Sequence, residues 1–296
     1  MNKSARAYPR KPPWLKVRLP HGDEYFKLSR RVRELKLNTV CEESNCPNIS
    51  ECWGRGTCTI MILGDLCTRA CGFCAVKAGR PTELDLQEPE RVAKAVAESG
   101  WSYVVLTSVA RDDLADGGSA IFAECIRRTR EASPGTRIEV LVPDFQGSET
   151  SLLEVLNARP DVFAHNIEVV RRLQKTVRSK ATYECSMGVL RRAKELKPQQ
   201  LTKTGLQVGH GESDDEILEL FDDLAAIHVD VLTIGQYLKP TSSPRHREVE
   251  RYVPPEEFER LAGEARSRGI PHVFAGPLVR SSYKAEQVFA GTGRGG

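Results

Sequence analysis

The sequence predicts an α/β fold built on a parallel β-sheet. From residue 59 onward, apolar runs with β propensity alternate with helical segments, which is the pattern of consecutive βα units. The 296 residues suit one barrel-sized domain with an extension, and 40% hydrophobic residues are ample for one core. Such a sheet is either closed into a barrel or doubly wound. About six βα units fall short of the eight of a full barrel.

The first segment of the chain is basic and rich in proline. Residues 1–20 hold six Lys or Arg, four prolines and no acid, and they lack the apolar run of a secretory signal. The prolines also oppose an amphipathic transit helix. We therefore expect an extended arm here, followed by a helix over 23–40 whose Leu28, Val32 and Leu35 share one side.

The predicted sheet begins at residue 59. We expect its strands at 59–64, 103–108, 137–142, 162–167, 203–208, 229–235 and 271–275. We expect its helices at 88–98, 119–131, 148–157, 187–196, 213–227 and 255–268. In a barrel of this kind the working groups collect at the carboxyl ends of the strands.

Seven of the nine cysteines fall within the 34 residues from Cys41 to Cys74. The second group, Cys67, Cys71 and Cys74, has the spacing CxxxCxxC. Three close thiolates suit a four-iron cluster, which can take three protein ligands and leave one iron open. Zinc is the alternative, but structural zinc normally has four ligands, and no further Cys or His follows Cys74 for about fifty residues.

The first group, Cys41, Cys46 and Cys52, has the spacing CxxxxCxxxxxC. Its three thiolates again fit an iron–sulfur cluster, although the spacing also allows zinc with Cys58 as a fourth ligand. A long chain with clustered cysteines is unlike a small secreted domain stapled by disulfides. We therefore expect a reducing compartment, the cytoplasm.

CxxxCxxC is also the spacing of the radical S-adenosylmethionine (SAM) enzymes. The two triads together with Arg280-Ser-Ser-Tyr283 resemble the lipoyl synthase family, and the resemblance runs from about Trp14 to Tyr283. It implies a partial (β/α)6 TIM-like barrel over 59–275. An extension over 1–58 would carry the first triad, and a C-terminal segment over 276–296 would close the barrel.

The resemblance implies two 4Fe–4S clusters. Cys67, Cys71 and Cys74 would hold the cluster that binds SAM. Cys41, Cys46 and Cys52 would hold an auxiliary cluster, with the Ser282 hydroxyl as its fourth ligand.

We expect contacts to SAM from six residues, the first three from the resemblance and the last three from their chemistry and position in the chain. They are Phe73, Thr107, Ser108, Asn166, Glu168 and Arg178. Phe73 would lie near the adenine, and Thr107 and Ser108 would lie near the methionine group. The amide and the carboxylate would bind the ribose hydroxyls and the ammonium group, because they share one side of an extended segment. The guanidinium would pair with the SAM carboxylate.

The implied activity is insertion of two sulfur atoms at carbons 6 and 8 of a protein-bound octanoyl-lysine, with the sulfur drawn from the auxiliary cluster. Two alternatives remain: another radical SAM sulfur-insertion enzyme with an auxiliary cluster, or a zinc-binding interaction module. The chain departs from the family at Gln207 and His210, where apolar residues are usual, and at Ser242-Ser-Pro-Arg-His246.

The implied partners are octanoylated lipoyl domains of 2-oxoacid dehydrogenase E2 subunits or the glycine-cleavage H protein. A reductant such as ferredoxin or flavodoxin and an iron–sulfur carrier that repairs the cluster complete the set. Residues 171–203 hold ten Lys or Arg against two acids, and we hypothesise that this run helps to dock an acidic carrier. A net charge of +3 and the absence of interleaved aromatics argue against nucleic acid, and no run of eighteen apolar residues predicts a membrane span.

Overall fold

The computed structural model describes residues 11–16, 23–44, 46–54, 57–291 and 293. Most of the arm expected over residues 1–20 lies outside these ranges. Its described part contains a 3-10 helix, η1 (Pro13–Leu15), in which Leu15 is buried. None of the helices in the described part combines the length and apolar character that a membrane crossing requires.

The seven strands that the sequence predicts all form, and they lie in one sheet with an added strand, β1. The spatial order is β1-β2-β5-β6-β7-β8-β9-β10. The strands span Asn38–Thr39 (β1), Thr59–Ile62 (β2), Tyr103–Ser108 (β5), Arg137–Leu141 (β6), Val162–Ala164 (β7), Leu201–Val208 (β8), Val231–Gln236 (β9) and His272–Gly276 (β10). The seven predicted strands run parallel to one another, and β1 is antiparallel to β2. The parallel α/β sheet is thereby confirmed.

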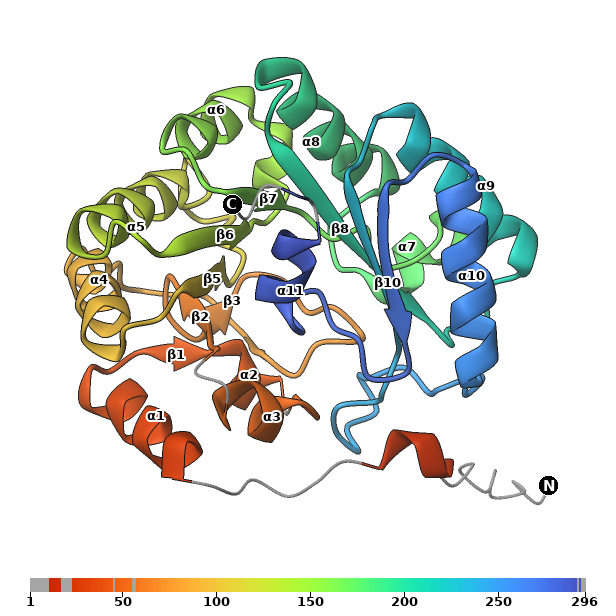
Figure 1. The fold of residues 1–296 in the computed structure, drawn as a ribbon, viewed down its shortest axis with the longest axis horizontal. Coiled ribbons are helices and arrows are strands. Elements are labelled where there is room, and N and C mark those ends of the chain that lie inside the picture. The colour runs from red at the N-terminus through yellow and green to blue at the C-terminus, as the bar shows by residue number, and fades with distance from the viewer. Residues whose placement is uncertain (1–10, 17–22, 45, 55–56, 292, 294–296) are drawn as a thin grey trace.

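Helices cover the outer side of this sheet (Figure 1). The six predicted helices are α4 (Glu88–Ser99), α5 (Ser119–Ala132), α6 (Glu149–Asn157), α8 (Tyr183–Leu196), α9 (Asp214–Ala226) and α10 (Pro255–Ser267). Side-chain caps define several of their first turns. Ser213 and Glu216 form a capping box at α9, and the Thr182 hydroxyl accepts the Cys185 amide at α8. The Thr182 cap explains why α8 begins at Tyr183, ahead of the predicted residue 187.

The sheet is curved, and among the described strands it does not close on itself. β10 pairs with β9, and no described strand links β10 to β1. In Figure 1 the strands form an arc with the helices outside it and α11 (Ala285–Ala290) inside it. Phe289 of α11 packs on Tyr103 at a ring distance of 6.0 Å, in a cluster with the first residues of β7 and β8. The segment after β10 therefore covers the amino ends of the strands.

The amino-terminal region differs from the prediction. The expected helix over 23–40 ends early, because α1 spans Asp23–Glu34 and Lys36 has a left-handed backbone (φ 50°). The chain then forms β1 and two short helices, α2 (Val40–Glu43) and α3 (Ile49–Gly54). Pairing with β2 outweighs the helical periodicity, since it satisfies backbone groups at the edge of the sheet.

Candidate functional site

The CxxxCxxC cysteines lie in a loop beyond the carboxyl end of β2. β3 (Leu66–Cys67) and β4 (Lys77–Ala78) form a small parallel pair that brackets this loop. Main-chain hydrogen bonds attach it to three distant parts of the chain. They run from Thr68 N–H to the Ala110 carbonyl (3.0 Å), from Gly72 N–H to the Val177 carbonyl (2.7 Å) and from Arg247 N–H to the Gly72 carbonyl (2.9 Å). The backbone of the loop is therefore well defined.

The thiols of this triad are half-buried and suited to metal ligation. Cys67 Sγ accepts the Ala110 amide (3.3 Å), and Cys71 Sγ accepts the Ser179 amide (3.4 Å). Burial raises the pKa of the Cys71 thiol and raises that of Cys74 to about 12. Amide donors stabilise a thiolate, and a bound metal deprotonates a thiol outright. Without a metal, the Cys71 and Cys74 thiols are poor nucleophiles at neutral pH.

Within the described ranges, no three His, Cys, Asp or Glu side chains converge as a site for a single metal ion requires. A four-iron cluster makes a different demand, because each cysteine binds a different iron.

Arg69 fixes this loop to two strand ends, a role that the sequence did not indicate. Its guanidinium donates to both carboxylate oxygens of Asp112 (2.7 to 3.1 Å) and to both of Asp144 (2.7 Å). The Arg69 side chain is 9% exposed and that of Asp144 is 3% exposed. Burial disfavours the ionised form of Asp144, but the hydrogen bonds and charge of Arg69 outweigh it and lower the pKa of Asp144 to about 2. Motif spacing identifies only the cysteines, since the two carboxylates follow other strands.

Asn166 and Glu168 lie together beyond the end of β7, as the sequence predicts. Asn166 Nδ2 donates to Glu168 Oε1 (3.0 Å), and Gln207 Nε2 from β8 donates to Glu168 Oε2 (2.6 Å). Burial raises the pKa of the Glu168 carboxyl, and the nearby Arg178 partly opposes this. The Glu168 charge in turn helps to raise the pKa of Cys71 and Cys74, so this carboxylate lies close to the cysteine loop.

The predicted hydroxyl residues differ in what they contact. Ser108 Oγ is buried and has no hydrogen-bond partner among the described residues, and the same is true of Asn166 Oδ1. Thr107 instead donates to the Leu141 carbonyl (2.8 Å). Buried polar atoms without a partner are costly, so Ser108 Oγ and Asn166 Oδ1 are available to accept a contact from a bound ligand.

Arg178 and Phe73 complete the predicted set. Arg178 Nη1 donates to Ser186 Oγ (2.7 Å), and this guanidinium forms no ion pair with a carboxylate in the described part of the chain. Burial lowers the pKa of Arg178, although the charge of Glu168 opposes the shift. Phe73 packs at the edge of the hydrophobic cluster under the second half of the sheet.

The first triad lies at the opposite end of β2. Because β1 runs antiparallel to β2, with Thr39 opposite Ile60, Cys41 falls beside the amino end of β2. This triad is therefore not at the carboxyl ends of the strands, where the sequence predicts the functional groups. Burial raises the pKa of Cys46 to about 11, and that of Cys52 to about 12.

Cys58, the alternative zinc ligand, is buried beside Cys41. A hydrogen bond between these two thiols lowers the pKa of Cys41 to about 7, and burial partly opposes this shift. The same contact and burial raise the pKa of Cys58. The other two cysteines outside the triads, Cys125 and Cys185, are also free thiols.

The segment that carries Ser282 reaches the first triad. Asn48 Nδ2 donates to the Leu278 carbonyl (2.7 Å), and the Tyr283 hydroxyl donates to Glu51 Oε2 (2.9 Å). The guanidinium of Arg280 lies near enough to the Cys46 thiol to moderate the rise of its pKa. The fold thus joins segments more than two hundred residues apart.

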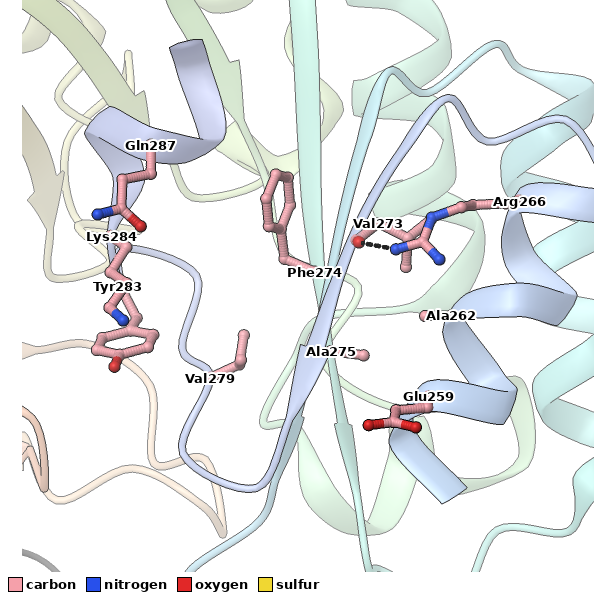
Figure 2. A pocket seen from close by; sticks show the side chains of 10 residues that line it. All are labelled: Glu259, Ala262, Arg266, Val273, Phe274, Ala275, Val279, Tyr283, Lys284 and Gln287. Carbon is pink, nitrogen blue, oxygen red and sulfur yellow. Dashed lines mark hydrogen bonds between the residues drawn. The ribbon is translucent and has the colours of Figure 1, made fainter. Parts of the chain in front are cut away.

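A cavity of about 350 Å³ lies among this C-terminal segment, β10 and α10. Figure 2 shows the side chains that line it. Phe274 extends from β10 toward the segment, and Val279 and Tyr283 lie across from it. Arg266 Nη2 donates to the Val273 carbonyl (2.8 Å) on the far side. None of the sequence-predicted site residues lines this cavity.

The basic run over 171–203 is largely paired within the chain. Its ion pairs include Arg171 with Glu184 and Asp223, Arg172 with Glu216, Lys180 with Asp112, Arg192 with Glu149, Lys194 with Asp230, and Lys203 with Glu139. The run therefore offers little uncompensated positive charge to an acidic partner.

Comparisons with known proteins agree with this geometry. Residues 61–224 match the model of the radical SAM superfamily, and residues 1–46 match that of the N-terminal domain of lipoyl synthase. The chain is 56% identical to the lipoyl synthase of Symbiobacterium thermophilum over 94% of this chain and 86% of that protein. It is also 56% identical to the lipoyl synthase of Geobacillus kaustophilus over 94% of this chain and 93% of that protein.

Solved structures of low sequence identity share the fold. Methylornithine synthase is 15% identical with a TM-score of 0.51, over 86% of this chain and 79% of that one. The hydrogenase maturase HydG from Carboxydothermus hydrogenoformans is 12% identical with a TM-score of 0.52, over 90% of this chain and 78% of that one. The superfamily match implies a 4Fe–4S cluster and SAM as cofactors. From the match to both family models and from the identity over nearly the whole length, the chain belongs to the lipoyl synthase family of the radical SAM superfamily.

Proposed function

We propose that the chain converts an octanoyl-lysine on a lipoyl domain into a lipoyl group by inserting sulfur at carbons 6 and 8. One observation carries the proposal. Two cysteine triads flank β2, one at each end, and the segment with Ser282 runs from β10 to the first of them. A substrate chain held inside the arc would lie between a site that generates a radical and a site that supplies sulfur.

The residues of the second triad fit a 4Fe–4S cluster. Cys67, Cys71 and Cys74 offer half-buried thiols, and amide donors reach two of the sulfurs. Arg69 attaches the loop to the segments that follow β5 and β6 through hydrogen bonds to Asp112 and Asp144. With three cysteines as ligands, one iron stays open for SAM.

The neighbouring residues fit SAM. The orphaned Ser108 Oγ and Asn166 Oδ1 offer polar contacts, and Glu168 offers a carboxylate for the ribose hydroxyls and the ammonium group. Arg178 has no carboxylate partner among the described residues and would pair with the carboxylate of SAM. Phe73 would lie near the adenine, and Thr107 near the methionine group. When bound, these cofactors supply a 5′-deoxyadenosyl radical that abstracts hydrogen from an unactivated carbon.

The first triad fits an auxiliary 4Fe–4S cluster as the sulfur source. Cys41, Cys46 and Cys52 would supply three ligands, and Ser282 would supply the fourth. An alkoxide is a more labile arm than a thiolate, which suits a cluster that is taken apart during the reaction. The contacts from Tyr283 and Leu278 keep the serine segment at the triad.

The proposal includes partners and a compartment. The substrate would be an octanoylated lipoyl domain of a 2-oxoacid dehydrogenase or the glycine-cleavage H protein. A ferredoxin or flavodoxin would deliver electrons, and an iron–sulfur carrier would rebuild the auxiliary cluster. All nine cysteines are free thiols, which suits a reducing compartment such as the cytoplasm.

Anaerobic iron and sulfide analysis with Mössbauer spectra tests the proposal. Wild type should bind about eight irons, and a variant with Cys41, Cys46 and Cys52 replaced by Ala should bind about four and form no lipoyl product. A Cys125→Ala/Cys185→Ala double variant serves as a control and should keep both clusters and activity. About four irons in both wild type and triple variant would remove the sulfur source and overturn the proposal.

A further inference from the structure

Glu168 has a backbone conformation that its surroundings must stabilise. Its φ of 67° lies in the left-handed region, which costs a residue with a side chain free energy. Two main-chain hydrogen bonds to β8 hold it there: Glu168 N–H to the Gly205 carbonyl (2.9 Å) and Gln207 N–H to the Glu168 carbonyl (2.7 Å). Strain held by neighbouring structure is common where a side chain must point at a ligand.

The side chains of β8 are arranged around the same group. Gly205 and Gln207 are two residues apart on a strand, so they face the same side, while Leu206 between them is buried in the core. A Cβ at Gly205 would lie 2.8 Å from Asn166 Oδ1, so only glycine leaves room for that amide. Gln207 reaches Glu168 Oε2 at 2.6 Å. β8 thus leaves space for the Asn166 amide at Gly205 and supplies a hydrogen-bond donor to Glu168 from Gln207.

The Glu168 carboxylate is held by amides on both oxygens. Asn166 donates to Oε1 and Gln207 to Oε2, and no described cation forms an ion pair with Glu168. Each carboxylate oxygen accepts two hydrogen bonds, so each retains one free acceptor site. Two donors, Asn166 beyond the end of β7 and Gln207 on β8, therefore fix the plane of the carboxylate and leave it open to a ligand.

We propose that Gln207 is a positioning residue that orients the Glu168 carboxylate as a hydrogen-bond acceptor for SAM. The proposal rests on the function proposed above. Gln207 is a position at which this chain departs from the apolar residue usual in the family, and the proposal gives the polar side chain a role. An apolar residue at 207 would leave Glu168 Oε2 without its donor, and the carboxylate would be free to rotate away.

Equilibrium dialysis of SAM with the anaerobically reconstituted enzyme tests this. Gln207→Met keeps the length of the side chain and removes the donor, so we expect SAM to bind about tenfold more weakly, because hydrogen bonds to charged groups are the stronger kind. In a Glu168→Gln background the same substitution should change the Kd by less than about twofold, since its effect acts through the carboxylate. Gln200→Met is the matched control. Gln200 precedes the other end of β8 and donates to the Pro160 carbonyl (3.1 Å), so its replacement should leave SAM binding unchanged.

Two results would overturn the proposal. One is an unchanged Kd in Gln207→Met; the other is an equal loss in the presence and absence of the Glu168 carboxylate. Iron content and Tm, measured on every variant, separate a folding defect from a binding defect. Failure of the wild type to bind SAM would instead contradict the proposed function.

Discussion

The two cysteine triads are attached to the protein in different ways. Backbone hydrogen bonds with Ala110, Val177 and Arg247 hold the loop that spans residues 67–74. The Arg69 guanidinium adds a fork of hydrogen bonds to the carboxylates of Asp112 and Asp144. The first triad follows β1, whose main chain pairs with β2, and it lies on and between helices of four and six residues. The hydrogen bonds described above between it and the C-terminal segment come from the side chains of Asn48 and Tyr283.

This difference matches the two roles proposed. A loop tied by main-chain bonds to three distant segments of the chain moves only if those segments are disturbed. The C-terminal segment is tied to the first triad by side chains, so the two can separate with the loss of a few hydrogen bonds of modest energy. The first arrangement suits a cluster that persists over many turnovers, and the second suits a cluster that is dismantled and rebuilt.

The largest expected effect separates radical generation from sulfur supply. Cys67→Ala should reduce cleavage of SAM to 5′-deoxyadenosine to background, because the cluster loses a ligand. Cys41→Ala should retain that cleavage and lose the lipoyl product. Mass spectrometry of both products from one reaction provides the measurement. Loss of 5′-deoxyadenosine in Cys41→Ala would show that the two sites are not independent.

Removing the Arg69 fork should destabilise the protein as well as the cluster. Arg69→Met removes the only cation paired with the buried Asp144 in the described part of the chain and leaves Asp112 with Lys180 (3.3 Å), which costs about 3–5 kcal/mol. We expect Tm to fall by on the order of 10 °C and iron retention at the second triad to fall with it. Arg130→Met is the control, since Arg130 makes a partly exposed pair with Asp161 (3.1 Å) and should cost less than about 1 kcal/mol. Equal losses in the two variants would contradict a special role for the fork.

The same fork predicts an acid-dependent loss of stability. The pKa of Asp144 is lowered in the folded protein to about 2 from an ordinary value of 3.8. The ionised Asp144 therefore makes its full contribution to the free energy of unfolding above about pH 4, and this contribution is lost as the pH falls through about 2. The shift is worth about 2 kcal/mol. Between pH 7 and pH 2.5, denaturant unfolding should show that the free energy of unfolding falls by about 1.5 kcal/mol less in Asp144→Asn than in wild type, because part of the contribution remains above the folded pKa. Parallel losses in the two proteins would rule out this titration as the cause.

The smallest effect concerns the link to the first triad. Tyr283→Phe removes a hydrogen bond to Glu51 worth about 1 kcal/mol. A chelator should therefore extract iron from the first triad about fivefold faster, with no change at the second. Tyr183→Phe is the matched control, because Tyr183 donates to Asp223 (2.7 Å) on α9 and should have no effect on iron release. If chelation rates do not change in Tyr283→Phe, the side-chain link does not control the lability of the cluster.

The order and type of the main elements follow from the sequence alone. Apolar runs and helical periodicity are local signals, so all seven strands and six helices were predicted with small errors at their ends. The cysteine spacings are local as well, and they indicate two metal sites before any fold is known. The prediction failed over 23–40, where pairing of β1 with β2 overrides a helical pattern.

Only the tertiary structure shows which of these groups meet. Arg69 carries no signal in the sequence, because its partners Asp112 and Asp144 follow strands that become its neighbours only in the folded sheet. Gln207 could be noted as a departure from the family, but its contact with Glu168 depends on β8 lying next to β7. The position of the first triad depends on the antiparallel direction of β1, which residue spacing does not encode. Local chemistry thus determines which ligands are available, and the packing of distant strands decides which of them form a site.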